Sequence, residues 1–246
     1  MIDFPSEILD MLAASSANAP IFPRLVHSRP STRSDRLNKE KLAAAQAYFL
    51  DCYPGGFAHP DMQAIAKKHK VDQRTAFAQK ELKKPCFDEP EAVVQAIAKL
   101  VSGSSMVSMF EKPKFKAAVE RSSPKERKGI AAAYYELLHG DEAAGFEQVA
   151  AFLQKHRVAK WPVATAVPCY FRPNKDVLIK PTTVKLIIAE LELPIKYGPK
   201  LDWAFYAQYR KYLAQARKQC DPALAPNNAA FAGFLMMSLG TRSAPS

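Results

Sequence analysis

The sequence predicts an all-α protein: a single globular domain of about ten helices behind an irregular N-terminal arm. Three observations support this prediction. The chain of 246 residues contains only 9 glycines, which is few for a sandwich or barrel with many tight turns. Its 19 prolines fall between stretches of alanine and other strong helix formers. Its hydrophobic content of 48% is sufficient for a packed core.

The N-terminal region divides into a short predicted helix, residues 6–14, and a segment of irregular composition, residues 15–35. Serine, proline and arginine dominate this segment, and it has no hydrophobic period, so we expect an arm without regular structure. The domain boundary is therefore predicted at residue 36. Residues 1–35 form the N-terminal helix and arm, and residues 36–246 form the helical domain.

Further helices are expected along the rest of the chain. Helix formers fill residues 35–53, and the Pro-Gly-Gly of residues 54–56 then ends the pattern. Residues 123–126, Ser-Pro-Lys-Glu, form a capping box with proline at the first helical position, and Gly140 suits the end of that helix. Residues 176–180 resemble a short strand but lack a partner run, so no sheet is expected. The helices predicted after residue 53 cover residues 60–82, 89–102, 104–119, 124–139, 142–156, 159–170, 182–192, 202–219 and 227–238.

Residues 60–82 allow two interpretations. The preferred one is a single continuous helix with a solvated lysine face. The alternative is a helix-turn-helix motif with Val71 in the turn, followed by a recognition helix. That helix would direct three side chains towards bases: Gln73, Arg74 and Gln79.

The protein is basic, with 35 Lys and Arg against 24 Asp and Glu and a net charge of +11. This balance favours a polyanionic partner. We expect nucleic acid, with DNA ahead of RNA and another polyanion as the alternative. The charge is concentrated in residues 151–200, which contain three acidic residues. The nine basic residues there are Lys155, Arg157, Lys160, Arg172, Lys175, Lys180, Lys185, Lys196 and Lys200.

Aromatic residues alternate with basic ones in the next segment, residues 202–218. Tyr206, Tyr209 and Tyr212 lie among arginines and lysines, and such a pattern can hold phosphates and stack on bases. The alternative is a buried aromatic stripe that includes Trp203, with the cations facing water.

Lys180 stands where a helix is expected to begin. A helix N-terminus carries about half a positive charge from its aligned peptide dipoles, so a cation there is repelled unless an anion is nearby. Pro181 suits the first helical position, and the hydroxyls of Thr182 and Thr183 lie beside free backbone N–H groups. This group of donors could grip a phosphate. The alternative is a lysine side chain that extends into water.

These features together predict a set of nucleic-acid-binding residues. The predicted residues are Lys160, Lys175, Lys180, Thr182, Thr183, Lys185, Arg210 and Lys211.

The sequence carries no recognised catalytic motif. It contains no glycine-rich phosphate loop, nucleophile elbow, paired-histidine zinc helix or calcium loop. The four cysteines are too far apart to match a zinc or redox motif, so we expect neither metal nor cofactor. The densest titratable cluster is residues 139–142, His-Gly-Asp-Glu. We interpret Asp141 as a helix N-cap, with acid/base chemistry by His139 and Asp141 as the alternative.

The sequence also predicts a cytoplasmic protein. The N-terminal residues include acidic side chains and no basic n-region, so they do not resemble a secretory signal. The longest uncharged apolar stretch, residues 223–240, is interrupted by Pro226, Asn227 and Asn228 and is too short to span a bilayer. No membrane association is expected.

Five blocks of the chain resemble a bacterial protein family to which we attach no function. They run from residue 53 to residue 212, so the resemblance covers most of the chain, and it implies a shared fold. The blocks are YPGGFAHPD, MFEKPKFKAAV, YYELLHG, KWPVATAVPCYFRPNKDVLIKPTTVK and LDWAFYAQYRKY.

Residues 157–194 also resemble the second half of the helix-hairpin-helix DNA glycosylases. In that family a glycine-rich hairpin binds a DNA phosphate, and a Val-Asp-Thr-His segment then opens a helix whose aspartate assists base excision. Here residues 155–162 lack the hairpin glycines, and Lys180 stands where the aspartate would be. The resemblance thus implies a glycosylase-like, DNA-binding fold without the usual catalytic aspartate.

The function expected from these observations is nucleic-acid binding, chiefly to the phosphates of duplex DNA through residues 155–218. A helical interaction or scaffold protein without a nucleic-acid role is the alternative. A hydrolase acting through His139 and Asp141 is a third hypothesis, although neither a nucleophile nor a metal set accompanies them. Nothing in the sequence indicates an oligomeric state.

Overall fold

The computed structural model describes residues 37–240, and these residues contain α-helices, three 3-10 turns and no strand. The all-α prediction is confirmed, and residues 176–180 have no regular structure. The predicted helix at 6–14 and arm at 15–35 lie outside the described residues. The eleven described helices are α2 (Lys39–Cys52), α3 (Pro60–His69), α4 (Val71–Glu81), α5 (Pro90–Gly103), α6 (Glu111–Arg121), α7 (Pro124–His139), α8 (Glu142–Lys155), α9 (Trp161–Phe171), α10 (Pro181–Glu190), α11 (Trp203–Arg217) and α12 (Asn228–Leu239). The 3-10 turns are η2 (Gly56–Ala58), η3 (Lys84–Asp88) and η4 (Pro222–Leu224).

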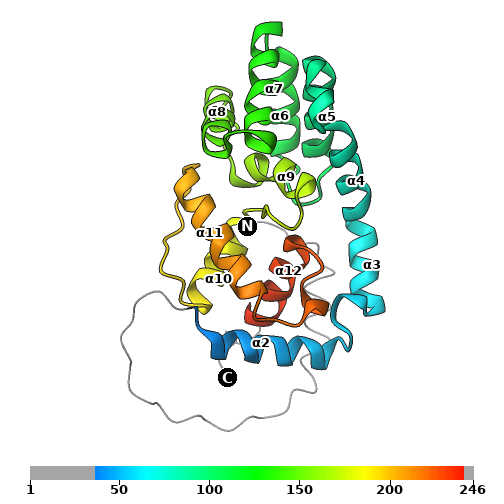
Figure 1. Ribbon diagram of the computed structural model, residues 1–246, viewed down its shortest axis with the longest axis vertical. Helices are drawn as coiled ribbons and strands as arrows, with labels where there is room; N and C mark the ends of the chain where they lie inside the picture. The colour runs from blue at the N-terminus through cyan, green and yellow to red at the C-terminus, as the bar shows by residue number, and fades with distance from the viewer. Residues whose placement is uncertain (1–36, 241–246) are drawn as a thin grey trace.

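Helix α9 is the centre of the arrangement. Nine of its 11 residues are buried, and it packs against α4, α5, α7 and α8. Figure 1 shows α5 to α8 at one end of the protein and α2, α10 and α12 at the other, with α9 between them. One hydrophobic cluster includes residues from every described helix, so residues 37–240 share a single core. None of these helices is long and apolar enough to cross a bilayer.

Local capping sets the ends of α7 and α8 as the sequence predicts. The Ser123 hydroxyl accepts a hydrogen bond from the Glu126 backbone N–H, and the Glu126 carboxylate accepts one from the Ser123 backbone N–H at 2.8 Å. Gly140 follows the last residue of α7. The Asp141 carboxylate then accepts from the backbone N–H groups of Ala143 and Ala144. Both the capping box and the N-cap interpretation of Asp141 are confirmed.

The preferred interpretation of residues 60–82 is wrong, because the helix is interrupted at Lys70. This residue adopts a left-handed conformation with φ of 51° and separates α3 from α4. A helix-turn-helix motif has a longer turn and a steep crossing of its two helices. Here one residue separates the helices, and Figure 1 shows α3 and α4 following each other along one side of the protein. The segment is therefore two consecutive helices without a helix-turn-helix motif.

Two of the three side chains predicted to read bases on α4, Arg74 and Gln79, are bonded within the protein, and the third, Gln73, is exposed. The Arg74 guanidinium donates to the backbone carbonyls of His69 and Gly103. The Gln79 amide donates to the backbone carbonyl of Phe171 at 3.3 Å. These bonds hold α4 against its neighbours, so Arg74 and Gln79 are not placed to read bases.

Residues 104–110 also differ from prediction, because the expected helix at 104–119 begins only at Glu111. The Ser104 hydroxyl is fully buried and forms a hydrogen bond with the Tyr170 hydroxyl at 3.0 Å. It also accepts a hydrogen bond from the Met106 backbone N–H. This contact with α9 holds the segment in a turn, since serine bonds readily to nearby backbone groups in non-helical conformations.

The close approach of α7 and α8 yields a first prediction. A Cβ atom on Gly145 would lie 2.1 Å from the Leu137 backbone nitrogen, so Gly145→Ala should separate the helices. We expect it to lower the free energy of unfolding by about 1–3 kcal/mol. Gly129→Ala on α7 is the matched control, because a Cβ atom there meets nothing within 4 Å. It should stabilise the protein by about 0.5–1 kcal/mol. Urea unfolding measures both, and equal stabilities would contradict this account of the helix pair.

Candidate nucleic-acid interface

The eight residues predicted to bind nucleic acid do not form one cluster. Lys175 and Arg210 lie in a network of ion pairs between α8, α9 and α11. Lys160 and Lys180 are the N-cap residues of α9 and α10, and Thr182 and Thr183 belong to the first turn of α10, Thr182 exposed and Thr183 buried. On α10 the Lys185 ammonium lies 5.3 Å from the centre of the Tyr197 ring. Lys211 is exposed on α11.

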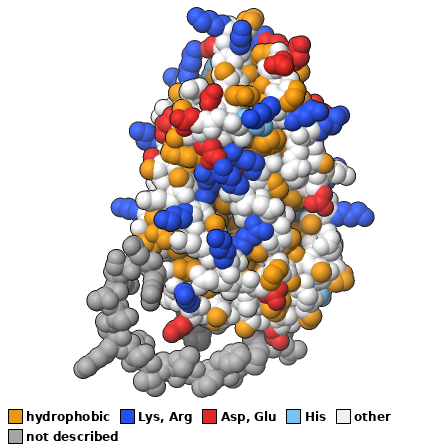
Figure 2. All heavy atoms as spheres, viewed as in Figure 1, with side chains coloured by type: hydrophobic (Ala, Val, Ile, Leu, Met, Phe, Trp, Pro, Cys, Tyr) orange, Lys and Arg blue, Asp and Glu red, His pale blue; other side chains and the backbone are white. Residues whose placement is uncertain are grey.

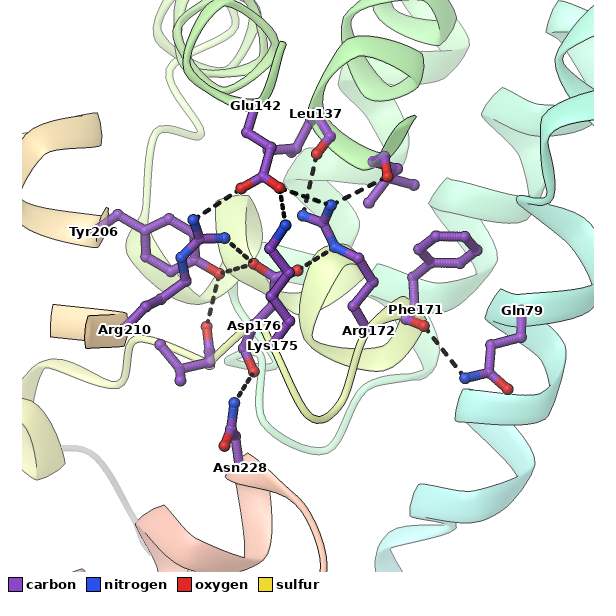
Figure 3. A network of polar contacts seen from close by, with 12 residues as sticks. Gln79, Leu137, Glu142, Phe171, Arg172, Lys175, Asp176, Tyr206, Arg210 and Asn228 are labelled. Atoms are coloured by element: carbon purple, nitrogen blue, oxygen red, sulfur yellow. Dashed lines mark hydrogen bonds and ion pairs between the residues drawn. The ribbon is translucent and has the colours of Figure 1, made fainter. Parts of the chain in front are cut away.

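The ion-pair network is built around Asp176, whose side chain is completely buried (Figure 3). Its carboxylate accepts hydrogen bonds from Arg172 Nε and from an Arg210 guanidinium nitrogen, each at 2.6 Å. The Tyr206 hydroxyl donates to the same carboxylate at 3.1 Å. The backbone carbonyl of Asp176 accepts from the Asn228 amide at 3.1 Å. One buried acid thus connects the end of α9 with α11 and α12.

Glu142 is the second acid of this network. It accepts hydrogen bonds from Arg172 at 3.1 Å, from Arg210 at 2.8 Å and from Lys175. Burial by itself would raise the pKa of Glu142, but the hydrogen bonds from Lys175 and Arg210 and the charge of Arg172 outweigh it and hold that pKa below 4.5. The positive charges of Lys175 and Arg210 are therefore matched by acids, and both residues serve the fold.

Arg172 adds contacts to the end of α7. Its guanidinium donates to the backbone carbonyls of Leu137 and Leu138, each at 3.1 Å, so it caps that helix. Sequence reasoning missed Arg172 and Asp176 as a pair. The spacing of four residues within Arg-Pro-Asn-Lys-Asp was the available indication.

The His139 and Asp141 cluster is accounted for by structural contacts. His139 Nε2 lies 2.8 Å from the Leu82 carbonyl oxygen, and its ring packs edge-on against Phe87 and Phe171. Asp141 caps α8, as described above. No group of three or more metal-ligating side chains occurs in the described part of the chain.

The aromatic pattern on α11 is a core stripe. Tyr206 and Tyr209 are buried, with exposed fractions of 0% and 1%. The Arg210 guanidinium lies over the rings of Trp203 and Tyr206, at 4.9 and 5.0 Å from their centres. The buried tyrosines cannot stack on bases, so that part of the interface hypothesis is wrong.

Lys180 does not extend freely into water. It is partly buried as the N-cap residue of α10, its side chain makes no capping hydrogen bond, and Pro181 takes the first helical position. The preceding residue, Ile179, is buried and donates its backbone N–H to the Thr165 hydroxyl at 3.0 Å, which fixes the backbone at the start of α10. Burial lowers the pKa of Lys180 from its usual 10.5.

Electrostatic interactions link Lys180 to His69, and link His69 and Lys112 to Arg74. The pKa of His69 is lowered, chiefly by burial. The charges of Lys68, Lys180 and Arg74 lower it further. Burial and then the charge of Arg74 lower the pKa of Lys112. These interactions place α3, α4, the first turn of α6 and the start of α10 in one positively charged region.

Lys160 extends this region past the start of α6. Its charge lowers the pKa of Glu111, the first residue of α6, although burial has the larger effect and raises that pKa overall. Glu111 is therefore an acid within a largely positive environment. We call the region the basic surface and define it by His69, Arg74, Lys112, Lys160 and Lys180.

Helix N-termini add positive potential to the basic surface. The N-cap residues of α4, α9 and α10 are Lys70, Lys160 and Lys180, and none forms a side-chain capping bond. The first backbone N–H groups of a helix have no partner within the helix. The aligned dipoles add about half a positive charge at each N-terminus. Because a lysine side chain carries no hydrogen-bond acceptor, these three residues cannot cap the donors with their side chains.

Charge is not continuous on the face of the protein that Figure 2 shows. Lys and Arg side chains occur there in separate groups, with acidic and hydrophobic side chains between them. A single basic stripe is therefore not a feature of this face.

The ion-pair network yields a second prediction. Because the folded-state pKa of Glu142 lies below 4.5, its ionised form stabilises the fold fully above that value, and this contribution is lost as pH falls through the folded-state pKa. Glu142→Gln should cost about 2–3 kcal/mol of unfolding free energy at neutral pH.

Urea unfolding as a function of pH tests this expectation. The difference between wild type and Glu142→Gln should shrink as pH is lowered below 4.5. Glu147→Gln, an exposed position on the same helix, should leave stability within about 0.5 kcal/mol of wild type. A pH-independent loss in Glu142→Gln would mean that packing rather than charge makes this residue stabilising.

Comparison of the chain with protein-family models, with curated proteins and with solved structures finds no match. The two resemblances described for residues 53–212 and 157–194 stay predictions.

Proposed function

We propose that this protein binds nucleic acid through the basic surface, chiefly by contacts with the phosphates of duplex DNA. The observation that carries the proposal is the grouping of His69, Arg74, Lys112, Lys160 and Lys180 around the starts of α4, α6, α9 and α10. Cationic side chains and helix N-termini both favour phosphate, by charge and by hydrogen bonding. Their combination at several neighbouring points suits a ligand with regularly spaced negative charges.

The proposed contacts are with the backbone of the nucleic acid rather than with the edges of its bases. Phosphate contacts supply affinity and orientation, and base-edge contacts supply sequence preference. Arg74 and Gln79 of α4 bond to backbone carbonyls of this protein, so they are not placed for base reading. The expected binding is therefore strongly dependent on salt and weakly dependent on sequence.

Binding without base excision agrees with the residues at the start of α10. In the glycosylases that residues 157–194 resemble, an aspartate opens this helix, whereas here Lys180 does. Asp176, the nearest acid before it in the sequence, is buried and bonded to two arginines. It is not available as a general base.

A helical interaction protein is the second candidate. The separated cationic groups in Figure 2 favour it, because evenly scattered charge maintains solubility without creating a binding site. Salt-dependent binding of nucleic acid would decide against it.

The third prediction is a steep salt dependence. The logarithm of the DNA-binding constant should fall linearly with the logarithm of salt concentration, with a slope of about −0.9 for each phosphate neutralised. Fluorescence anisotropy with a labelled duplex, at several salt concentrations, measures this slope. Binding that is absent at low salt, or that does not respond to salt, would overturn the proposed function.

A fourth prediction assigns the contacts to the basic surface. Lys160→Glu and Lys180→Glu should each weaken binding to all duplexes tested and reduce the magnitude of the salt slope by about 1. Lys128→Glu is the control, because it makes the same change of charge at an exposed position on α7. Lys160 is exposed and Lys180 is partly buried, so Lys160→Glu is the variant that least affects folding. Equal losses in all three variants would show that only net charge matters.

A further inference from the structure

The loop between α5 and α6 ends in two exposed apolar side chains. Met109 is 73% exposed and Phe110 is 74% exposed, and they are the large hydrophobic side chains that the described residues leave in solvent. Exposing an aromatic ring forgoes about 1.5–3 kcal/mol of burial free energy. Two such residues side by side at the start of a charged helix are an arrangement that the packing of the core does not explain.

The loop is anchored at its beginning. The Ser104 hydroxyl is bonded to Tyr170 of α9, as described above. Ser105 Oγ lies 2.8 Å from His69 Nδ1 at the end of α3, and Val107 is buried with 3% of its surface exposed. The exposed pair therefore follows directly on a segment that is fixed to two other helices.

The loop is equally well ordered at its end. The Ser108 hydroxyl accepts a hydrogen bond from the Phe110 backbone N–H at 3.3 Å. The Ser108 carbonyl accepts from the backbone N–H groups of Glu111 and Lys112, at 3.0 and 3.2 Å. The backbone beneath Phe110 is thus held before any partner binds, so a contact through this ring loses little conformational entropy.

The surroundings of the pair are positively charged. Lys112 and Lys114 follow it on α6, and Lys112 is a member of the basic surface. Lys160 lies close enough to lower the pKa of Glu111, the residue next to Phe110. A partner that meets Phe110 therefore also meets cations and should carry negative charge.

The size of the apolar area restricts the partner further. A specific protein interface buries about 1,200–2,000 Å², whereas one aromatic side chain supplies about 150–250 Å². The apolar area does not continue along α6, because Phe115, Ala118 and Val119 are buried in the core. A membrane-binding helix would present such residues on its surface. One exposed ring beside cations matches the face of a single nucleobase and its phosphates.

We infer that Phe110 is a base-stacking contact, so that the protein prefers DNA with unpaired bases to an intact duplex. This inference rests on the proposed function, since the basic surface supplies the phosphate contacts that bring a base to the ring. Bases in an intact duplex are stacked on one another, whereas an unpaired base can be turned outward at a lower cost. Met109 flanks the ring and widens its apolar surface.

Binding of two labelled DNAs tests this inference: an intact duplex, and the same duplex with a bulge of unpaired thymines. The full-length protein should bind the bulged DNA more tightly. Phe110→Ala should weaken binding to the bulged DNA by about 5- to 150-fold, the range that base–aromatic stacking supplies, and leave binding to the intact duplex unchanged. Because Phe110 is exposed, folding should be unaffected, and a thermal melt verifies this.

Two further variants separate stacking from simple hydrophobic contact. Phe110→Trp should keep or increase the preference for bulged DNA, and Phe110→Leu should lose it although leucine remains apolar. Lys160→Glu should weaken binding to both DNAs by the same factor, because it removes only a phosphate contact.

Each contrary outcome has a distinct meaning. Salt-dependent binding of both DNAs with equal affinity, unchanged in Phe110→Ala, would overturn the stacking role and leave the proposed function standing. Full preference in Phe110→Leu would likewise overturn stacking. Flotation with phosphatidylserine vesicles, lost in Phe110→Ala, would assign the ring to a membrane and overturn the inference. Absence of salt-dependent DNA binding would overturn both the inference and the proposed function.

Discussion

The buried carboxylate of Asp176 is the interaction on which the middle of this structure depends. A carboxylate without solvent costs several kcal/mol unless charged partners and hydrogen bonds replace the lost water. Arg172 and Arg210 supply the charge, and Tyr206 supplies a third hydrogen bond. Because these partners come from the end of α9 and from α11, the ion pairs oblige the two helices to meet at this point. Glu142 binds the same two arginines and brings α8 to the junction.

The path of the chain after Asp176 follows from this junction. Val177 and Ile179 are buried, and the Ile179 backbone N–H is bonded to Thr165 of α9. These contacts fix the position of the backbone at Lys180, where α10 begins. Lys180 therefore lies near His69 and the other basic groups. Three of these groups, His69, Arg74 and Lys112, precede it by more than sixty residues in the sequence. Helix α9 thus runs from Lys160, its N-cap residue in the basic surface, to Arg172, its C-cap residue in the ion-pair network.

Basic residues that are close together in the sequence of this protein do not all lie together on its surface. Nine basic residues in residues 151–200 predict a single binding region. The structure divides them, because Glu142 lies outside that segment and forms ion pairs with Arg172 and Lys175. Lys160 and Lys180 stay in the basic surface, at the starts of α9 and α10, and the charge of Lys160 acts on Glu111. The aromatic residues of α11 pack in or against the core. Among the described residues, the exposed aromatic ring is that of Phe110, in the loop before α6.

The sequence by itself determined the helical class and those helix ends that depend on neighbouring residues. The Ser123 capping box and the Asp141 N-cap are examples, because their bonds join residues within a few positions. The proline at the start of α10 is another, because its ring fixes its own backbone angle. Only the tertiary structure decided the break at Lys70 and the turns of residues 104–110. In those places Arg74 bonds to Gly103, and Ser104 bonds to Tyr170. The tertiary structure also decided which cations are neutralised, because electrostatic energy depends on distance in space and not on separation along the chain.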